Sequence, residues 1–312
     1  MRNLFFSMLI LTSACMSCDK NDFGIKNDLS GNTEKQEISL SVGINKTRSK
    51  IIRSVLNDFP TGAEIGIFAT TGALGNHYDN EIANANVKAT HNSGIWSCEP
   101  PIYLSNNNAK LFAYYPYDNS NSDGSAVPVE HTSQTDYLYG THPESTVDNG
   151  NPNIRLNMNH ALALLQFKLS KLNYTGAAKL TKIEVVNATG KTVLYSKGTL
   201  DISTGKITST EGENKSAVIS GDLLTIPNIA SSEESDYPKI MLLPCQTRDV
   251  GEIIINFTID DKVYTYSVPS ETKWETGTKS TYTVTIQGTA LTVGDVIISD
   301  WTDGISGSIN LQ

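Results

Sequence analysis

Apolar and polar residues alternate in short runs along most of this 312-residue chain, as they do in half-buried β-strands. In the first half, the pattern predicts strands at EISLSVGI, AEIGIFA, ANVKAT, PIYLS, AKLFAYYPY and ALALLQFKLS. Loops rich in Asn, Gly and Pro separate these runs, and residues 118–126 and 142–153 form long polar loops. Only residues 49–59, SKIIRSVLNDF, have helical spacing. Their apolar positions are Ile52, Val55, Leu56 and Phe59.

A second series of short strands begins near Leu180. It comprises LTKIEVVNA, GTLDIST, AVISG, LLTIP, KIMLLP, EIIINFTID, KVYTYSVP, STYTVTIQ and DVIISDW. Turn sequences such as DISTGK and IDDK bound several of these strands. Many short strands with frequent turns are typical of sandwiches and barrels. The two series therefore predict an all-β protein with two β-sandwich domains, residues 36–172 and 173–312, joined near residues 170–178.

Arg2 and the apolar run LFFSMLILT lie near the start of the chain, and together they have the charge and length of a signal peptide. The run is too short to cross a bilayer, which takes about 20 apolar residues. A small residue then precedes each of two cysteines, Cys15 and Cys18. A cysteine at the end of such a run is typical of a bacterial lipoprotein signal. Residues 1–17 are therefore predicted to be a lipoprotein signal peptide.

Cys18 is the favoured lipidation site because Asp19, Lys20 and Asp22 follow it almost directly. Cys15 is one alternative, because the small residues Ser13 and Ala14 precede it. The other alternative is an ordinary signal peptide that is cleaved without lipidation. Acyl chains would anchor the protein with about 0.8 kcal/mol per buried CH₂ group. Residues 18–35 are rich in Asn, Asp, Lys and Gly, which predicts a flexible tether above the membrane.

Composition excludes several classes of function. The formal net charge is −9 and no basic cluster occurs, which argues against nucleic acid as a partner. Beyond the signal, Cys98 and Cys245 form neither a disulfide framework nor a zinc pattern, and whether they pair is open. Dinucleotide, P-loop, zinc-protease and nucleophile-elbow motifs are absent, so no enzyme activity and no cofactor are predicted. The histidines are scattered, at His77, His91, His131, His142 and His160.

Three patterns have both a functional and a structural interpretation. His160 could be a catalytic base, but a strand-end histidine hydrogen-bonded near the core is favoured. A loop resembles a calcium-binding loop but begins with Asn, contains Pro and lacks flanking helices, so a solvated loop is favoured and no metal is predicted. Its candidate ligands are Asn119, Asn121, Asp123 and Glu130. Aromatic residues at Trp96, Tyr103 and 114–117 could stack on sugars, although strand-rich chains more often bury them.

Several segments together resemble the fimbrillin family of Bacteroidales, which supplies subunits and related lipoproteins of type V pili. They are TGAEIGIFA, KLFAYYPY, DYLYG, NHALALLQFKL, GTLDISTGKI, KWETGTKSTYTVTI and VIISDWTDG. Their order and the lipoprotein signal carry the resemblance, which spans nearly the whole chain. It implies two transthyretin-like β-sandwich domains, export as a lipoprotein to the outer membrane and cell surface, and assembly into fimbriae with other subunits by strand donation.

The resemblance also implies processing. In polymerising members, a trypsin-like protease removes the first strand, and the matching segment here is INKTRSK, with Arg48 as the candidate site and Arg53 as the alternative. A polar loop that is never cut is the other interpretation. Family analogy makes the C-terminal stretch the donor strand, with the candidate plugs Val296, Ile298, Ile305 and Ile309. The alternative function is a surface lipoprotein that binds a glycan or another surface receptor and does not polymerise.

Overall fold

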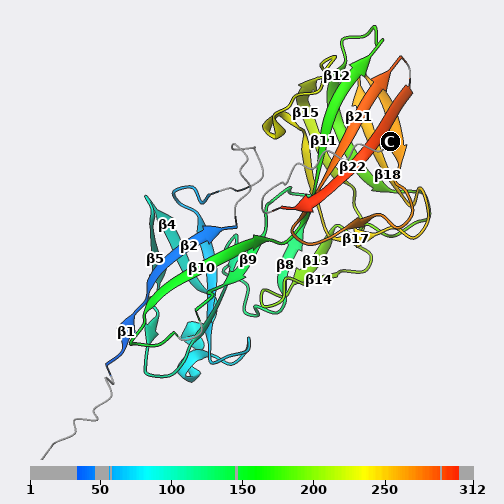
Figure 1. Cartoon of the computed structure of the whole chain (residues 1–312). Helices are drawn as coiled ribbons and strands as arrows, with labels where there is room; N and C mark the ends of the chain where they lie inside the picture. The colour runs from blue at the N-terminus through cyan, green and yellow to red at the C-terminus, as the bar shows by residue number, and fades with distance from the viewer. Residues whose placement is uncertain (1–33, 46–55, 57, 145–146, 289, 302–312) are drawn as a thin grey trace, which may run out of the picture. The chain divides into compact units, whose positions relative to one another are not determined.

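The computed structural model describes residues 34–45, 56, 58–144, 147–288 and 290–301 (Figure 1). Regular structure in these ranges consists of strands and three short 3-10 turns, with no α-helix, so the all-β prediction is confirmed. The 3-10 turns span Tyr78–Asn80, Ile82–Asn84 and Glu234–Asp236. Most of the helix-like segment 49–59 lies outside the described residues. A search of the described ranges finds no helix suited to crossing a membrane.

The first half of the chain forms a seven-stranded sheet that curls into a near-barrel. Its order is β2 (Ser39–Ile44), β10 (Asn153–His160), β9 (Leu138–Thr141), β7 (Lys110–Tyr115), β3 (Glu64–Thr70), β4 (Val87–Asn92) and β5 (Ile95–Glu99). Strand β2 runs parallel to β10, and all other neighbours are antiparallel. The two edge strands, β2 and β5, approach one another and almost close the sheet. Strands β1 (Gln36–Glu37) and β6 (Tyr103–Leu104) form a separate, short antiparallel pair.

Apolar side chains fill the inside of this near-barrel. The alternation of its strands sends one face inward, and burying that face is the main force that holds a sheet of this kind together. The fully buried members include Ile65, Ile67, Leu111, Leu138, Leu156 and Met158.

The second half forms two four-stranded sheets that share one apolar core. One has the order β16 (Lys239–Leu242), β11 (Ala163–Leu172), β21 (Thr278–Gln287) and β22 (Ala290–Asp300). The other has the order β15 (Ala217–Thr225), β12 (Lys179–Asn187), β18 (Ile253–Ile259) and β19 (Lys262–Ser267). Phe167 of the first sheet and Phe257 of the second meet edge to face, with ring centroids 5.2 Å apart. Such contacts between facing sheets are typical of sandwich packing.

Smaller sheets complete the fold. Strand β8 (Val127–Glu130) pairs with β13 (Lys197–Leu200), which pairs with β14 (Ile207–Ser209), so one sheet takes strands from both halves of the chain. Strands β17 (Cys245–Gln246) and β20 (Lys273–Trp274) form a further pair. The two cysteines whose pairing the sequence left open are both free thiols. Burial raises the pKa of each to about 12, which favours the neutral thiol over the thiolate.

Candidate functional site

Strand β2 covers the core of the near-barrel from its edge. The sequence predicts one apolar face for residues 36–44, and the structure confirms it. Ile38 and Ile44 are buried, Leu40 and Val42 are half-buried against the same core, and the intervening side chains are exposed. Each apolar side chain that is fully buried in this way contributes roughly 1.5–3 kcal/mol, so the strand is a substantial part of the near-barrel's stability.

Backbone hydrogen bonds attach β2 at both ends. The Ser39 N–H donates to the Pro152 carbonyl at 2.9 Å, and the Asn45 N–H donates to the Met158 carbonyl at 2.8 Å. Between them, β2 lies alongside β10 in parallel register, as Figure 1 shows in blue and green. Because β2 is the edge strand, taking it away would uncover the free edge of β10 together with the apolar core beneath it.

The residues predicted for lipidation and processing are not among those that the structure describes. They are Cys15, Cys18, Arg48 and Arg53. The chain is described again at Leu56, whose backbone N–H donates to the Asp136 carboxylate at 2.8 Å. That carboxylate therefore fixes the point at which the chain enters the near-barrel after the predicted processing sites.

Asp136 and His160 form a buried pair at the end of β10. Their side chains are each 1% exposed, and Asp136 Oδ1 lies 2.9 Å from His160 Nδ1. The favoured interpretation of His160, a strand-end histidine hydrogen-bonded near the core, is confirmed. Since the second oxygen of Asp136 accepts from Leu56, one carboxylate ties together two segments that are far apart in the sequence. Losing either partner would leave a buried polar group without a hydrogen bond, which lowers the stability of the fold.

Trp301 packs on the other side of His160. The two rings are stacked, with centroids 4.1 Å apart and an interplanar angle of 12°. The indole is fully buried in a small apolar cluster, and the Trp301 backbone N–H donates to the Gly277 carbonyl at 2.7 Å. Trp301 is the last described residue, so this contact anchors the chain directly before its C-terminal segment.

Strand β22, which leads to Trp301, is an apolar edge strand. Figure 1 shows it in red beside β21, its neighbour in the sheet. Val296, Ile297 and Ile298 are 38%, 46% and 59% exposed, although all three are large apolar side chains. Exposed apolar residues on an unpaired edge favour pairing with another chain. Two donor candidates, Val296 and Ile298, lie on this strand, whereas Ile305 and Ile309 fall outside the described residues.

Most of the remaining candidates have structural roles. Trp96 and Tyr114 are buried, as the core interpretation of the aromatic residues predicts, while Tyr103 is 45% exposed. In the loop that resembles a calcium site, one Asp123 oxygen already accepts the backbone N–H and the hydroxyl of Ser125, at 2.8 and 2.7 Å. The described residues hold no group of three acidic, His or Cys side chains placed to bind a metal.

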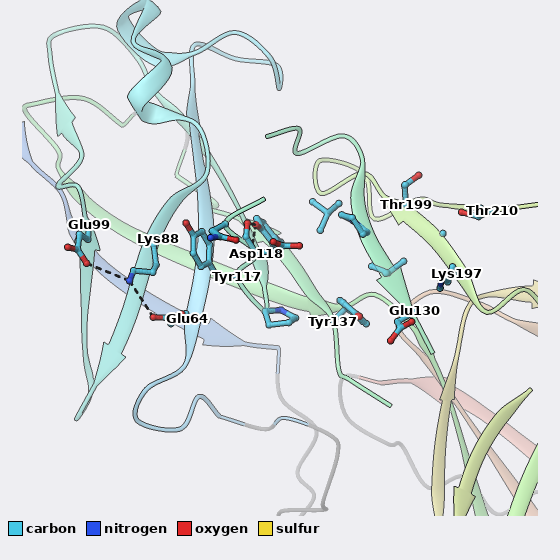
Figure 2. A pocket seen from close by; sticks show the side chains of 17 residues that line it. Glu64, Lys88, Glu99, Tyr117, Asp118, Glu130, Tyr137, Lys197, Thr199 and Thr210 are labelled. Atoms are coloured by element: carbon cyan, nitrogen blue, oxygen red, sulfur yellow. Dashed lines mark hydrogen bonds and ion pairs between the residues drawn. The ribbon is translucent and has the colours of Figure 1, made fainter. Parts of the chain in front are cut away.

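Sequence reasoning does not predict a cleft of about 1060 Å³ in the structure. Figure 2 shows residues of β3, β4 and β5 on one side and residues of β8 and β13 on the other, with Tyr117 and Asp118 between them. The cleft has both charged and aromatic walls. Because it is built from strands that lie far apart in the sequence, no local motif marks it.

Comparison with known proteins places this all-β chain in a class of bacterial surface proteins. The fimbrillin-like family profile matches residues 52–301, and the chain belongs to this family. The resemblance seen in the sequence is therefore confirmed. No curated protein sequence matches the chain.

Solved structures agree in fold. A proposed cell adhesion protein from Bacteroides uniformis is 20% identical with a TM-score of 0.60, and the match covers 86% of this chain and 99% of that one. A second such protein, from Bacteroides ovatus, is 17% identical with a TM-score of 0.62, covering 86% and 98%. At these identities the likeness shows a common fold.

Proposed function

We propose that this protein is a subunit of surface fimbriae that assembles by strand donation and serves in cell adhesion, without enzymatic activity. The observation that carries the proposal is β2, an edge strand whose apolar face covers the near-barrel core. Membership of the fimbrillin-like family supports it.

The physical basis for strand donation is the exposure of the near-barrel core when β2 is removed. An uncovered groove presents apolar side chains and unpaired backbone groups, and a strand from another subunit satisfies both at once. The exposed apolar edge at Val296 and Ile298, followed by Ile305 and Ile309, makes the C-terminal stretch the proposed donor. Other subunits of the same fimbria are the proposed partners.

The proposal includes two transthyretin-like sandwich domains, residues 36–172 and 173–312. The separate cores of the near-barrel and of the two four-stranded sheets support a division into two domains, with Ala163, Leu165 and Phe167 of β11 in the core of the four-stranded sheets. Strand β11 pairs with β16 and β21, so the pairing favours assigning β11 to the second domain.

The proposed location is the outer surface of the cell, with a lipid anchor at Cys18 and residues 18–35 as the tether. We expect Cys18→Ala to abolish metabolic labelling with palmitate, because the thiol that carries the lipid is gone. Cys15→Ala is the matched control and should label like the natural protein. Loss of label in Cys15→Ala with labelling kept in Cys18→Ala would move the anchor to Cys15.

Limited trypsin digestion is expected to cut first after Arg48 and leave the body folded. Proteases cut chain that opens easily, while a strand paired on both sides resists. Arg155 provides the internal comparison, since its side chain is exposed but its backbone lies within β10, opposite Ser41 of β2. Terminal sequencing of the large fragment should give Ser49, and Arg48→Ala should move the cut to another basic residue of the same segment, Lys46, Lys50 or Arg53. Early cutting at Arg155 would contradict the proposal.

A further inference from the structure

We propose that the cleft between β3, β4 and β5 on one side and β8 and β13 on the other binds a neutral saccharide. This goes beyond fimbrial assembly, because none of the side chains that line the cleft belongs to β2 or β22. Its volume of about 1060 Å³ suits several sugar units. Figure 2 shows the side chains of Tyr117 and Asp118 between two polar walls.

A rigid loop places the central residues of the cleft. The buried Tyr114 hydroxyl donates to Asn86 Oδ1 at 2.8 Å and accepts the Asp118 N–H at 3.1 Å. The Tyr117 N–H donates to the Glu64 carbonyl at 3.0 Å. Gly66 lies directly against the Tyr114 ring, where any larger residue would clash. These contacts hold Tyr117 and Asp118 in position before a ligand arrives, which lowers the entropic cost of binding.

Both walls carry donors and acceptors. On one wall, Lys88 Nζ lies 3.6 Å from Glu64 Oε1 and 3.6 Å from Glu99 Oε2. On the other, Glu130 and Lys197 line the cleft, with Thr199 and Thr210 nearby. Between the walls, hydrogen bonds from the Ser120 hydroxyl and backbone N–H hold the pKa of Asp118 below its usual value, so its carboxylate stays a charged acceptor.

This combination fits a sugar better than a charged ligand. Each sugar hydroxyl both donates and accepts, so it can use lysines and carboxylates together. The apolar face of a sugar ring can pack on the half-buried Tyr117 and Tyr137 rings. A cation would meet Lys88 and Lys197, one on each wall, and an anion would meet carboxylates that outnumber those lysines.

A glycan array that includes neutral, anionic and cationic glycans tests this inference on the purified, uncut protein. We expect neutral glycans to bind, with an affinity that changes less than about twofold between about 0.05 and about 0.5 M NaCl, since salt screens only charge attraction. For the strongest neutral glycan, Tyr117→Ala and Glu130→Gln should each weaken binding about tenfold by calorimetry.

Val263→Ala is the control, because Val263 is 62% exposed on β19 and lies outside the cleft. It should bind like the natural protein, and thermal melting confirms that each variant is folded. Binding restricted to charged glycans, binding of no glycan at all, or unchanged binding by folded Tyr117→Ala and Glu130→Gln would each overturn the inference. Since the uncut protein is used, none of these results depends on whether it can polymerise.

Discussion

Replacing Trp301 by alanine is expected to lower the free energy of unfolding by about 3–5 kcal/mol. The indole is fully buried, packs in its own apolar cluster and stacks on His160. Its removal leaves a cavity at the point where β22 ends, and the surrounding side chains can fill such a cavity only in part. Urea denaturation followed by circular dichroism measures the loss. The C-terminal segment should also become more sensitive to protease, because its anchor is gone.

Ile298→Ala is the matched control for this variant. Ile298 lies on the same strand, but its side chain is 59% exposed, so its truncation should change stability by no more than about 0.5 kcal/mol. Equal effects of the two substitutions would show that Trp301 is not the anchor of the C-terminal strand.

Asp136→Ala is expected to cost about 2–5 kcal/mol of stability and to open the segment before Leu56 to trypsin. The buried carboxylate accepts the Leu56 N–H and lies 2.9 Å from His160 Nδ1. Without it, the half-buried Leu56 N–H and the buried His160 ring both lose their partner, and each unsatisfied group costs about 1–3 kcal/mol. Asp136→Asn keeps one acceptor oxygen and should show a smaller loss.

Asp222→Ala is the control for this substitution. Asp222 is 79% exposed and forms a surface ion pair with Lys179 at 2.7 Å, a kind of contact worth about 0–1 kcal/mol. If Asp136→Ala unfolds at the same urea concentration as Asp222→Ala, the buried pair does not hold the chain at Leu56.

Local sequence patterns predict the strands in which apolar and polar residues alternate clearly, and those that contain a continuous apolar run. EISLSVGI corresponds to β2, AEIGIFA to β3 and KLFAYY to β7, because burial of one face dictates both the sequence and the structure. Two predicted strands, AVISG and LLTIP, are one strand, β15, that continues through Gly221. Glycine in a sequence often indicates a turn. Gly221, however, lies within β15 at positive φ, beside an irregularity in the pairing of β15 with β12.

Other strands go unnoticed for physical reasons. Strand β10 alternates Ile154, Leu156 and Met158 with Asn and Arg, a signal that was available but was hidden by the polar loop before it. Strands β8 and β9 are four residues long, too short for a periodic pattern. Their positions depend on partners distant in sequence, which no local pattern contains.

The sequence predicted only those features of the candidate site that depend on residues close together in the chain. The apolar face of β2 and the structural role of His160 follow from their neighbours in the sequence. The contact of His160 with Trp301, the hydrogen bond from Leu56 to Asp136 and the saccharide cleft all join residues that are far apart in the chain. Such sites arise from tertiary packing, so sequence periodicity cannot reveal them.

Loss of β2 is expected to convert a folded monomer into an assembling subunit. The size distribution of the trypsin-cut protein, measured by light scattering and electron microscopy, tests this expectation beside uncut protein and a cut variant lacking residues 302–312. That deletion keeps Trp301 and β22 but removes Ile305 and Ile309. The account predicts oligomers or filaments from the cut, intact-tailed protein, and monomers from the other two. A cut, folded, intact-tailed protein that stays monomeric at high concentration would contradict it.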